Sequence, residues 1–186
     1  MNEEHQDSLR MYVNDVIGVE RDIVNAIEGQ LEDDRVKEDA ALVVVLNGII
    51  AGGKSRIALL KELSEVEGGS LGATVKEAAM SVTGVLAGLY GKLREHPVSR
   101  IVRDDRIAMN VVETSYAMLY TFALGVGHQR CAELALGGLN AAAPQVLALT
   151  DVLPGVILRE IAKDAPLVDP FVETKVLDAI HSAWKA

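Results

Sequence analysis

Residues 41–55 read ALVVVLNGIIAGGKS, and the fold of the chain depends on the conformation of this stretch. Its second half, residues 48–55, satisfies the pattern GxxxxGK[ST], in which a loop after a β-strand holds a phosphate. In that interpretation the apolar first half is the strand, Lys54 reaches the outer phosphates of a nucleotide, and the Ser55 hydroxyl holds magnesium. The candidate nucleotide-binding residues are Gly53, Lys54 and Ser55.

The rest of the chain favours a helix for the same stretch. A phosphate-binding loop is built on a parallel sheet of several strands, and only residues 146–150 offer a further strand candidate. Elsewhere apolar residues recur at three- and four-residue spacing, which indicates helices. We therefore expect residues 41–55 to be helical, with nucleotide binding as the alternative.

The same periodicity divides the chain into helices, and their ends carry capping signals. Ser99 is expected to cap the fourth helix, and Asp169-Pro170 to start the last one. Pro144 and Pro154 lie within the fifth helical region and are expected to break or kink it. The predicted helices cover about residues 6–31, 36–66, 71–95, 99–126, 129–163 and 169–185.

Glycines recur within the predicted helices, at Gly48 and Gly52 and again at Gly84, Gly88 and Gly91. Glycine costs about 1 kcal/mol relative to alanine in a helix interior, so a packing reason is expected. The sequence predicts a tight helix crossing or a seam between two copies of the chain.

Composition indicates one soluble domain over residues 1–186, because hydrophobic residues make up 49% and charged residues 24%. The single cysteine, Cys131, excludes an internal disulfide, and the first residues lack the features of a secretory signal, so we expect a cytoplasmic location. The longest apolar stretch ends at Lys54, too short for the roughly 20 residues of a membrane span, and no membrane association is expected.

Charge argues against nucleic acid as a partner. The net charge is −9, and residues 1–68 hold 15 acidic and 7 basic side chains, whereas the remainder holds 12 and 11. Aromatic residues make up only 4% of the chain. An acidic chain with few aromatic residues lacks the basic surface that phosphates require and the rings on which bases stack.

Several segments resemble bacterial ferritin-like proteins of unknown function. Residues 102–105 (VRDD) and 115–124 (SYAMLYTFAL) are similar to the third bundle helix of these proteins. Residues 20–23 (ERDI) resemble the first helix, residues 57–63 (IALLKEL) the end of the second, and Leu153-Pro154 the end of the fourth. The resemblance implies an all-α, ferritin-like up-down four-helix bundle. The segment at about residues 71–95 would be an extra crossover helix, and a C-terminal helix at about residues 169–185 would pack as an appendage or lid.

Active members of this family hold two metal ions between one glutamate from each of two helices and a Glu-x-x-His pair from each of the other two. Glu20 matches the first-helix position and Glu113 lies at or next to the third-helix position. Gly53 and Arg56 occupy the second-helix pair. The fourth-helix pair falls among residues that cannot serve, namely Ala141, Ala142, Pro144 and Gln145.

The sequence therefore predicts a bundle without an intact di-iron centre, in which an inward Glu20 pairs with Arg56 because a buried charge needs a partner. We expect an uncharacterised structural or interaction protein that acts as a homodimer, and we do not expect an enzyme or a cofactor. Two alternatives stay open: a residual site for iron or another divalent metal at Glu20 and Glu113, and nucleotide binding at residues 48–55. An unidentified protein partner or a small apolar ligand between the helices is also consistent with the sequence.

Overall fold

The structure is a computed structural model that describes residues 2–66 and 97–185, and this part of the chain is helical without any β-strand. The all-α fold class is therefore confirmed. The four long helices are α1 (Glu3–Gln30), α3 (Ala40–Val66), α5 (Val98–Gly125) and α6 (Gln129–Asp164). The two short ones are α2 (Asp34–Lys37) and α7 (Val172–Ala183). The predicted crossover helix and the glycines Gly84, Gly88 and Gly91 lie outside the described residues.

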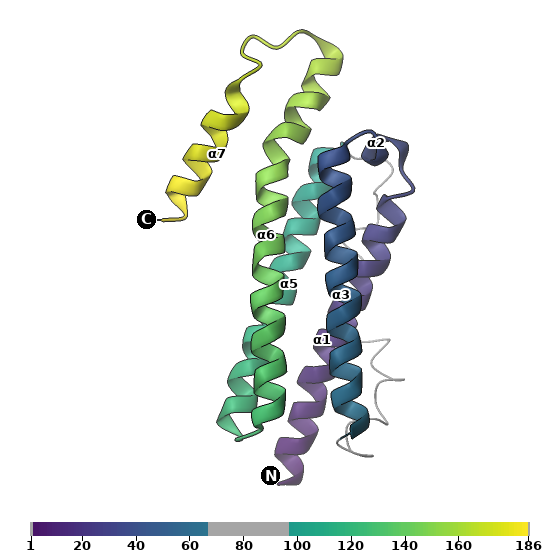
Figure 1. Cartoon of the computed structure of the whole chain (residues 1–186), viewed down its shortest axis with the longest axis vertical. Coiled ribbons are helices and arrows are strands. Elements are labelled where there is room, and N and C mark those ends of the chain that lie inside the picture. The colour runs from purple at the N-terminus through teal and green to yellow at the C-terminus, as the bar shows by residue number, and fades with distance from the viewer. Residues whose placement is uncertain (1, 67–96, 186) are drawn as a thin grey trace.

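The four long helices pack side by side in a closed ring (Figure 1). Helix α1 contacts α3 and α5, and α6 contacts the same two helices from the other side. In Figure 1, α1 and α6 run upward whereas α3 and α5 run downward, so every contacting pair is antiparallel. Helices α3 and α5, which flank residues 67–96 in the sequence, run in the same direction.

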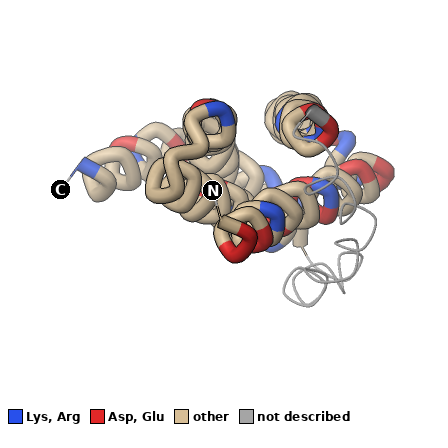
Figure 2. The backbone as a smooth tube through the Cα atoms, turned by 90° about the horizontal axis from the view of Figure 1, so that it is seen from below, with Lys and Arg blue, Asp and Glu red and all other residues tan. Residues whose placement is uncertain are grey.

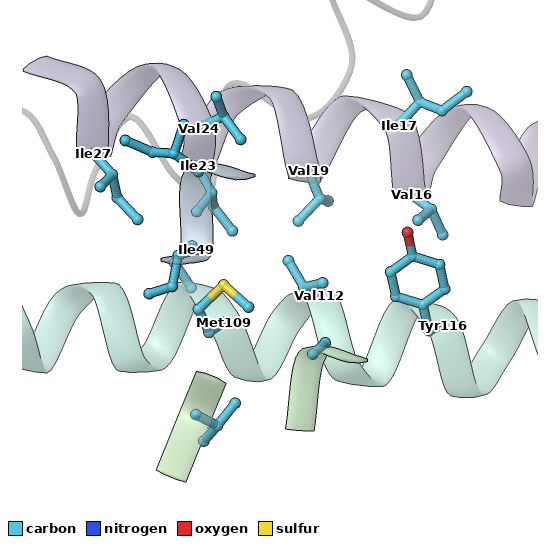
Figure 3. Close-up of a cluster of buried hydrophobic side chains, with 14 of the residues drawn as sticks. Val16, Ile17, Val19, Ile23, Val24, Ile27, Ile49, Met109, Val112 and Tyr116 are labelled. Atoms are coloured by element: carbon cyan, nitrogen blue, oxygen red, sulfur yellow. The ribbon is translucent and has the colours of Figure 1, made fainter. Parts of the chain in front are cut away.

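One hydrophobic core lies inside this ring. Figure 3 shows its centre, where Val16 and Val19 of α1 face Val112 and Tyr116 of α5. The apolar residues of α5 that recur at helical spacing are buried, namely Met109, Val112, Tyr116, Leu119 and Ala123. Burial of each large apolar side chain contributes about 1.5–3 kcal/mol, so these stripes are the main source of stability.

Helix ends differ from the predictions by a few residues, and the differences have local causes. Helix α1 begins at Glu3 because the Asn2 side chain accepts a hydrogen bond from the amide of His5 at 2.9 Å. Figure 2 shows acidic residues at this end of the helix. Glu3 and Glu4 lie in the first turn, where their negative charges interact favourably with the positive end of the helix dipole. The predicted helix over residues 36–66 is instead divided into α2 and α3. The division falls at Asp39, whose carboxylate accepts from the amide of Leu42 at 3.1 Å.

The prediction that Ser99 caps the next helix is wrong. Helix α5 begins at Val98 after Pro97, and the amide of Ser99 donates to the Glu160 carboxylate of α6 at 3.2 Å. The first amides of a helix lack acceptors within the helix, so any well-placed carboxylate can satisfy them. A residue distant in sequence replaces the local cap here.

The sequence predicts a break or a kink at Pro144 and Pro154. No break occurs, because α6 continues through both residues, and a kink stays a prediction. Proline removes one backbone donor and leaves the carbonyl four residues earlier without its helical partner. At Pro144 that carbonyl belongs to Asn140, which is exposed and therefore open to water. At the second position Pro154 and the two residues after it, Gly155 and Val156, are buried, which holds α6 against its neighbours.

The last helix, α7, begins at Val172 and not at Asp169, whose carboxylate accepts from the amide of Phe171 at 2.9 Å just before the helix. It lies outside the ring, beside α6, and none of its residues is buried (Figure 1). His181 contacts Asp151 of α6 at 2.7 Å, and Trp184 stacks on the Arg106 guanidinium at 5.2 Å. The His181 side chain therefore joins α7 to α6.

Among the described helices, two are long and apolar enough to cross a membrane by length and composition alone. These are Ala40–Glu65, with a mean hydropathy of 1.5, and Gln129–Asp164, with a mean hydropathy of 1.6. Core helices of soluble proteins share this length and composition, so these two helices do not establish a membrane location. The absence of membrane association and the cytoplasmic location both stay predictions.

Candidate functional site

A buried ion pair joins α1 to α3 in the middle of the ring. Glu20 is 1% exposed and Arg56 is 5% exposed. The Nε group of Arg56 donates to one carboxylate oxygen of Glu20, and Nη2 donates to the other at 3.0 Å. The expected pair is therefore present, in the two-pronged geometry that makes arginine–carboxylate contacts strong.

Gln145 of α6 extends this pair to a third helix. Its side-chain oxygen accepts from Nη1 of Arg56 at 3.1 Å, and its nitrogen donates to the carbonyl of Gly48 at 3.0 Å. Both the oxygen and the nitrogen of the Gln145 side chain are hydrogen-bonded to α3, so this contact between α3 and α6 leaves neither atom without a partner. The sequence placed Gln145 in the fourth-helix ligand position, and its contact with Arg56 depends on how α3 and α6 pack.

Tyr116 of α5 contributes the fourth side chain and is only 1% exposed. Burial raises the pKa of its phenol far above the ordinary value, and the Glu20 carboxylate raises the pKa further, while Arg56 opposes this effect. Within the described residues the hydroxyl has no hydrogen bond of good geometry. For Arg56 burial alone lowers the pKa, but the hydrogen bonds and charge of Glu20 outweigh it and the pKa is raised. Arg56 therefore keeps its charge, and the phenol stays neutral. We name Glu20, Arg56, Gln145 and Tyr116 the polar core cluster.

Three glycines provide the space for these side chains. A Cβ atom on Gly138 of α6 would lie 2.2 Å from Tyr116 Cε1. A Cβ on Gly53 would lie 3.1 Å from a Glu20 oxygen, and one on Gly52 would lie 2.6 Å from Gln145 Nε2. A distance below about 3 Å requires the neighbouring atom to move. At Gly138 these atoms belong to the buried Tyr116 ring, and a Cβ on Gly53 would also lie 2.7 Å from Val24 Cγ2, so glycine is needed at both positions. At Gly52 the close atoms are the ends of flexible side chains, which can move more easily.

Within one chain Gly48 and Gly52 do not form the predicted tight helix crossing, and the seam between two copies stays a prediction. Gly52 makes room for side chains, and a Cβ on Gly48 would meet nothing within 4 Å. The helical spacing of the glycines was visible in the sequence, but spacing alone does not distinguish room for a side chain from room for a backbone.

The residual metal site at Glu20 and Glu113 receives no support from the geometry. Both oxygens of Glu20 are bound by Arg56, and Glu113 is half-buried on α5 beside the inner stripe. In residues 2–66 and 97–185 no group of three or more His, Cys, Asp or Glu side chains is placed to hold a metal ion.

The phosphate-loop interpretation of residues 48–55 requires a strand followed by a loop, and the structure contradicts this. Helix α3 runs from Ala40 to Val66 without interruption, so the amides at these positions are directed along the helix and not towards a ligand. Gly53 is buried beside Glu20, Ser55 is exposed, and Lys54 pairs with Glu28 of α1 at 2.6 Å.

Further buried polar contacts join helices that the sequence did not connect. Gln30 of α1 donates to Asp105 of α5 at 2.7 Å, and Arg159 of α6 donates to Asp39 at 2.9 Å. Charged residues interrupting an apolar stripe, as Asp105 does, are the signal in the sequence that marks such positions. Cys131 is buried, and His128 caps α6 by accepting from the Cys131 amide at 3.2 Å.

A pocket of about 270 Å³ lies next to the polar core cluster, between α3 and α6. Arg56 and Tyr116 line its inner end, and Ser55 and Glu133 lie at its exposed edge. The remaining described lining is apolar or glycine: Gly52, Leu59, Leu60, Leu134, Gly137, Gly138 and Ala141. No family model, curated protein or solved structure matches this chain.

Proposed function

We propose that this chain is a metal-free helical interaction protein of ferritin-like architecture that acts as a homodimer. The observation that carries the proposal is the Arg56 guanidinium, which occupies the core between the helices and binds both oxygens of Glu20. The positive charge of Arg56 repels a metal cation, and its hydrogen bonds occupy the Glu20 carboxylate that would otherwise bind the metal. The core is thereby a structural element and not a catalytic centre.

The arrangement of the long helices supports the ferritin-like architecture. All contacting pairs among α1, α3, α5 and α6 are antiparallel, and α3 and α5 run in the same direction (Figure 1). A bundle with this order of directions needs one long crossover between its second and third helices, which is the ferritin-like connection. Residues 67–96 occupy that position in the sequence.

The outer face of α3 supports association with a second copy. Val44 is 72% exposed, and Gly48 and Ala51 are exposed at the spacing of one helical face. Helix α3 has no charged residue from Ala40 to Gly53. Only 28% of its most apolar window is buried within one chain. An uncharged face of small residues can pack against its own copy about a twofold axis, because it has no charge to repel an identical partner.

Metal content tests the first part of the proposal. We expect protein purified without chelator to contain less than stoichiometric metal by elemental analysis, and iron titration to leave its spectrum unchanged. Stoichiometric metal that is lost in Glu20→Ala would instead support the residual metal site.

Oligomeric state tests the second part. Sedimentation equilibrium of the full chain is expected to show a dimer, and Ala51→Glu to shift it towards the monomer. Ala162→Glu, at an exposed position near the end of α6, is the matched control and should leave the dimer intact. A monomer at every concentration, or equal effects of both substitutions, would contradict association through α3.

A further inference from the structure

The pocket between α3 and α6 contains buried hydrogen-bond donors beside apolar walls. A guanidinium has five N–H groups. In the described part of the chain, three of those of Arg56 have acceptors, two on Glu20 and one on Gln145. Arg56 lines the pocket together with Tyr116, whose buried hydroxyl has no hydrogen-bond partner within the described residues, so polar donors border the unfilled space.

Charge restricts what can occupy this space. Arg56 and Glu20 form a neutral pair in which both members are nearly inaccessible to water. A carboxylate or phosphate in the pocket would add an unpaired buried negative charge, and an ammonium would lie against the guanidinium. An uncharged hydrogen-bond acceptor satisfies the donors without either penalty.

Size and wall chemistry restrict the occupant further. Leu59, Leu60 and Leu134 supply apolar walls, and Gly137 and Gly138 leave one side without side chains. The volume of about 270 Å³ lies just below the range of roughly 300–1,000 Å³ that holds drug-sized ligands. The occupant is therefore a small molecule and not a long acyl chain.

From these observations we infer that the pocket is a binding site for a small uncharged molecule with an apolar body and one carbonyl- or ether-type oxygen. The oxygen accepts a hydrogen bond from Arg56, and the apolar body lies against the three leucines. The Glu20 carboxylate and Gln145 hold the guanidinium in place before the ligand arrives, so little ordering is needed on binding. This inference does not depend on the proposed homodimer.

Cyclohexanone and methylenecyclohexane form a matched pair of probes, because they have similar shapes and only the ketone has an acceptor. We expect cyclohexanone to shift the NMR resonances of Arg56 Nε–H and the Gly137 and Gly138 amides saturably. Its affinity should exceed that of the hydrocarbon about tenfold, the value of a hydrogen bond to a charged donor. Equal affinities, or no saturable shift with the ketone, would overturn the inference.

Substitutions that fill the pocket test whether the probe binds there. A Cβ on Gly137 meets nothing within 4 Å, so Gly137→Leu is expected to fold and to abolish the shifts. Ala141→Leu is a second, independent blocking variant in the same lining. Gly29→Leu places the same side chain at an equally open glycine of α1 away from the pocket and should bind as the native chain does. Undiminished binding in folded Gly137→Leu or Ala141→Leu would show that the probe binds elsewhere.

Discussion

At the scale of single residues, Glu20 and Arg56 depend on each other. Each is nearly inaccessible to water, and each carries a charge whose burial is costly without the other. The pair joins α1 to α3, and Gln145 joins the same guanidinium to α6. A change at either charged residue therefore affects three helices.

Arg56→Met is expected to lower the free energy of unfolding by about 3–5 kcal/mol, because it leaves the Glu20 carboxylate buried without a partner. The double variant Glu20→Met with Arg56→Met removes both charges and should recover most of this loss. Urea unfolding followed by circular dichroism measures both. A double variant as unstable as Arg56→Met would show that packing, and not the unpaired charge, accounts for the loss.

Tyr116 predicts a specific dependence on alkaline pH. Because its pKa in the folded chain is raised, the folded state retains the phenol proton after the unfolded state has lost it. Stability is therefore fully present below about pH 10, the ordinary tyrosine pKa, and falls above it by about 1.4 kcal/mol per pH unit.

The comparison with Tyr116→Phe isolates this effect from other groups that titrate at high pH. At pH 7 the variant should be about as stable as the native chain, since the native hydroxyl has no well-formed hydrogen bond in the described residues. Above pH 10 the variant should become the more stable of the two in urea unfolding. Parallel pH profiles would mean that Tyr116 ionises without unfolding.

At the scale of elements, the contact between α5 and α6 depends on one glycine. The Tyr116 ring lies against Gly138 so closely that a Cβ atom would overlap three of its carbon atoms. The neighbouring Gly137 is exposed and has open space at its Cβ position. Two adjacent glycines in the same helix thus have opposite requirements.

Gly138→Ala is expected to destabilise the chain by about 1–3 kcal/mol through overpacking against Tyr116. Gly137→Ala should stabilise it by about 1 kcal/mol, because alanine is the better helix former and meets nothing. Thermal unfolding of both variants gives the comparison. Similar effects of the two substitutions would contradict the close packing of the Tyr116 ring on α6.

At the scale of the whole molecule, the ring of four long helices shares one core, and α7 lies outside it. Helix α7 has no buried residue, and it is attached through His181 and Trp184 to residues of α6 and α5. Elements with few buried apolar contacts open at lower free energy than the core. The chain therefore has a cooperative unit and a weakly held appendage.

Trp184 is the only tryptophan, so its fluorescence reports on α7 alone. We expect its transition in urea to occur at lower denaturant concentration than the loss of helix measured by far-ultraviolet circular dichroism. Arg106→Ala removes the guanidinium that stacks on the Trp184 side chain. It should move the fluorescence transition to a still lower urea concentration, with little change in the midpoint measured by circular dichroism. Coincident transitions in the native chain would place α7 within the cooperative unit.

The sequence by itself determined the helical class, the approximate extent of the long helices and the pairing of Glu20 with Arg56. Periodicity states which face of a helix is buried, and a buried charge demands an opposite one. Only the tertiary structure decided that Gln145 completes this pair, that Tyr116 packs on Gly138 and that Glu160 caps α5. The structure also confirmed the helix that the sequence favoured for residues 48–55 over a phosphate-binding loop. The contacts of Gln145, Tyr116 and Glu160 depend on how closely helices far apart in the sequence approach one another, and the spacing of residues within one helix does not specify this.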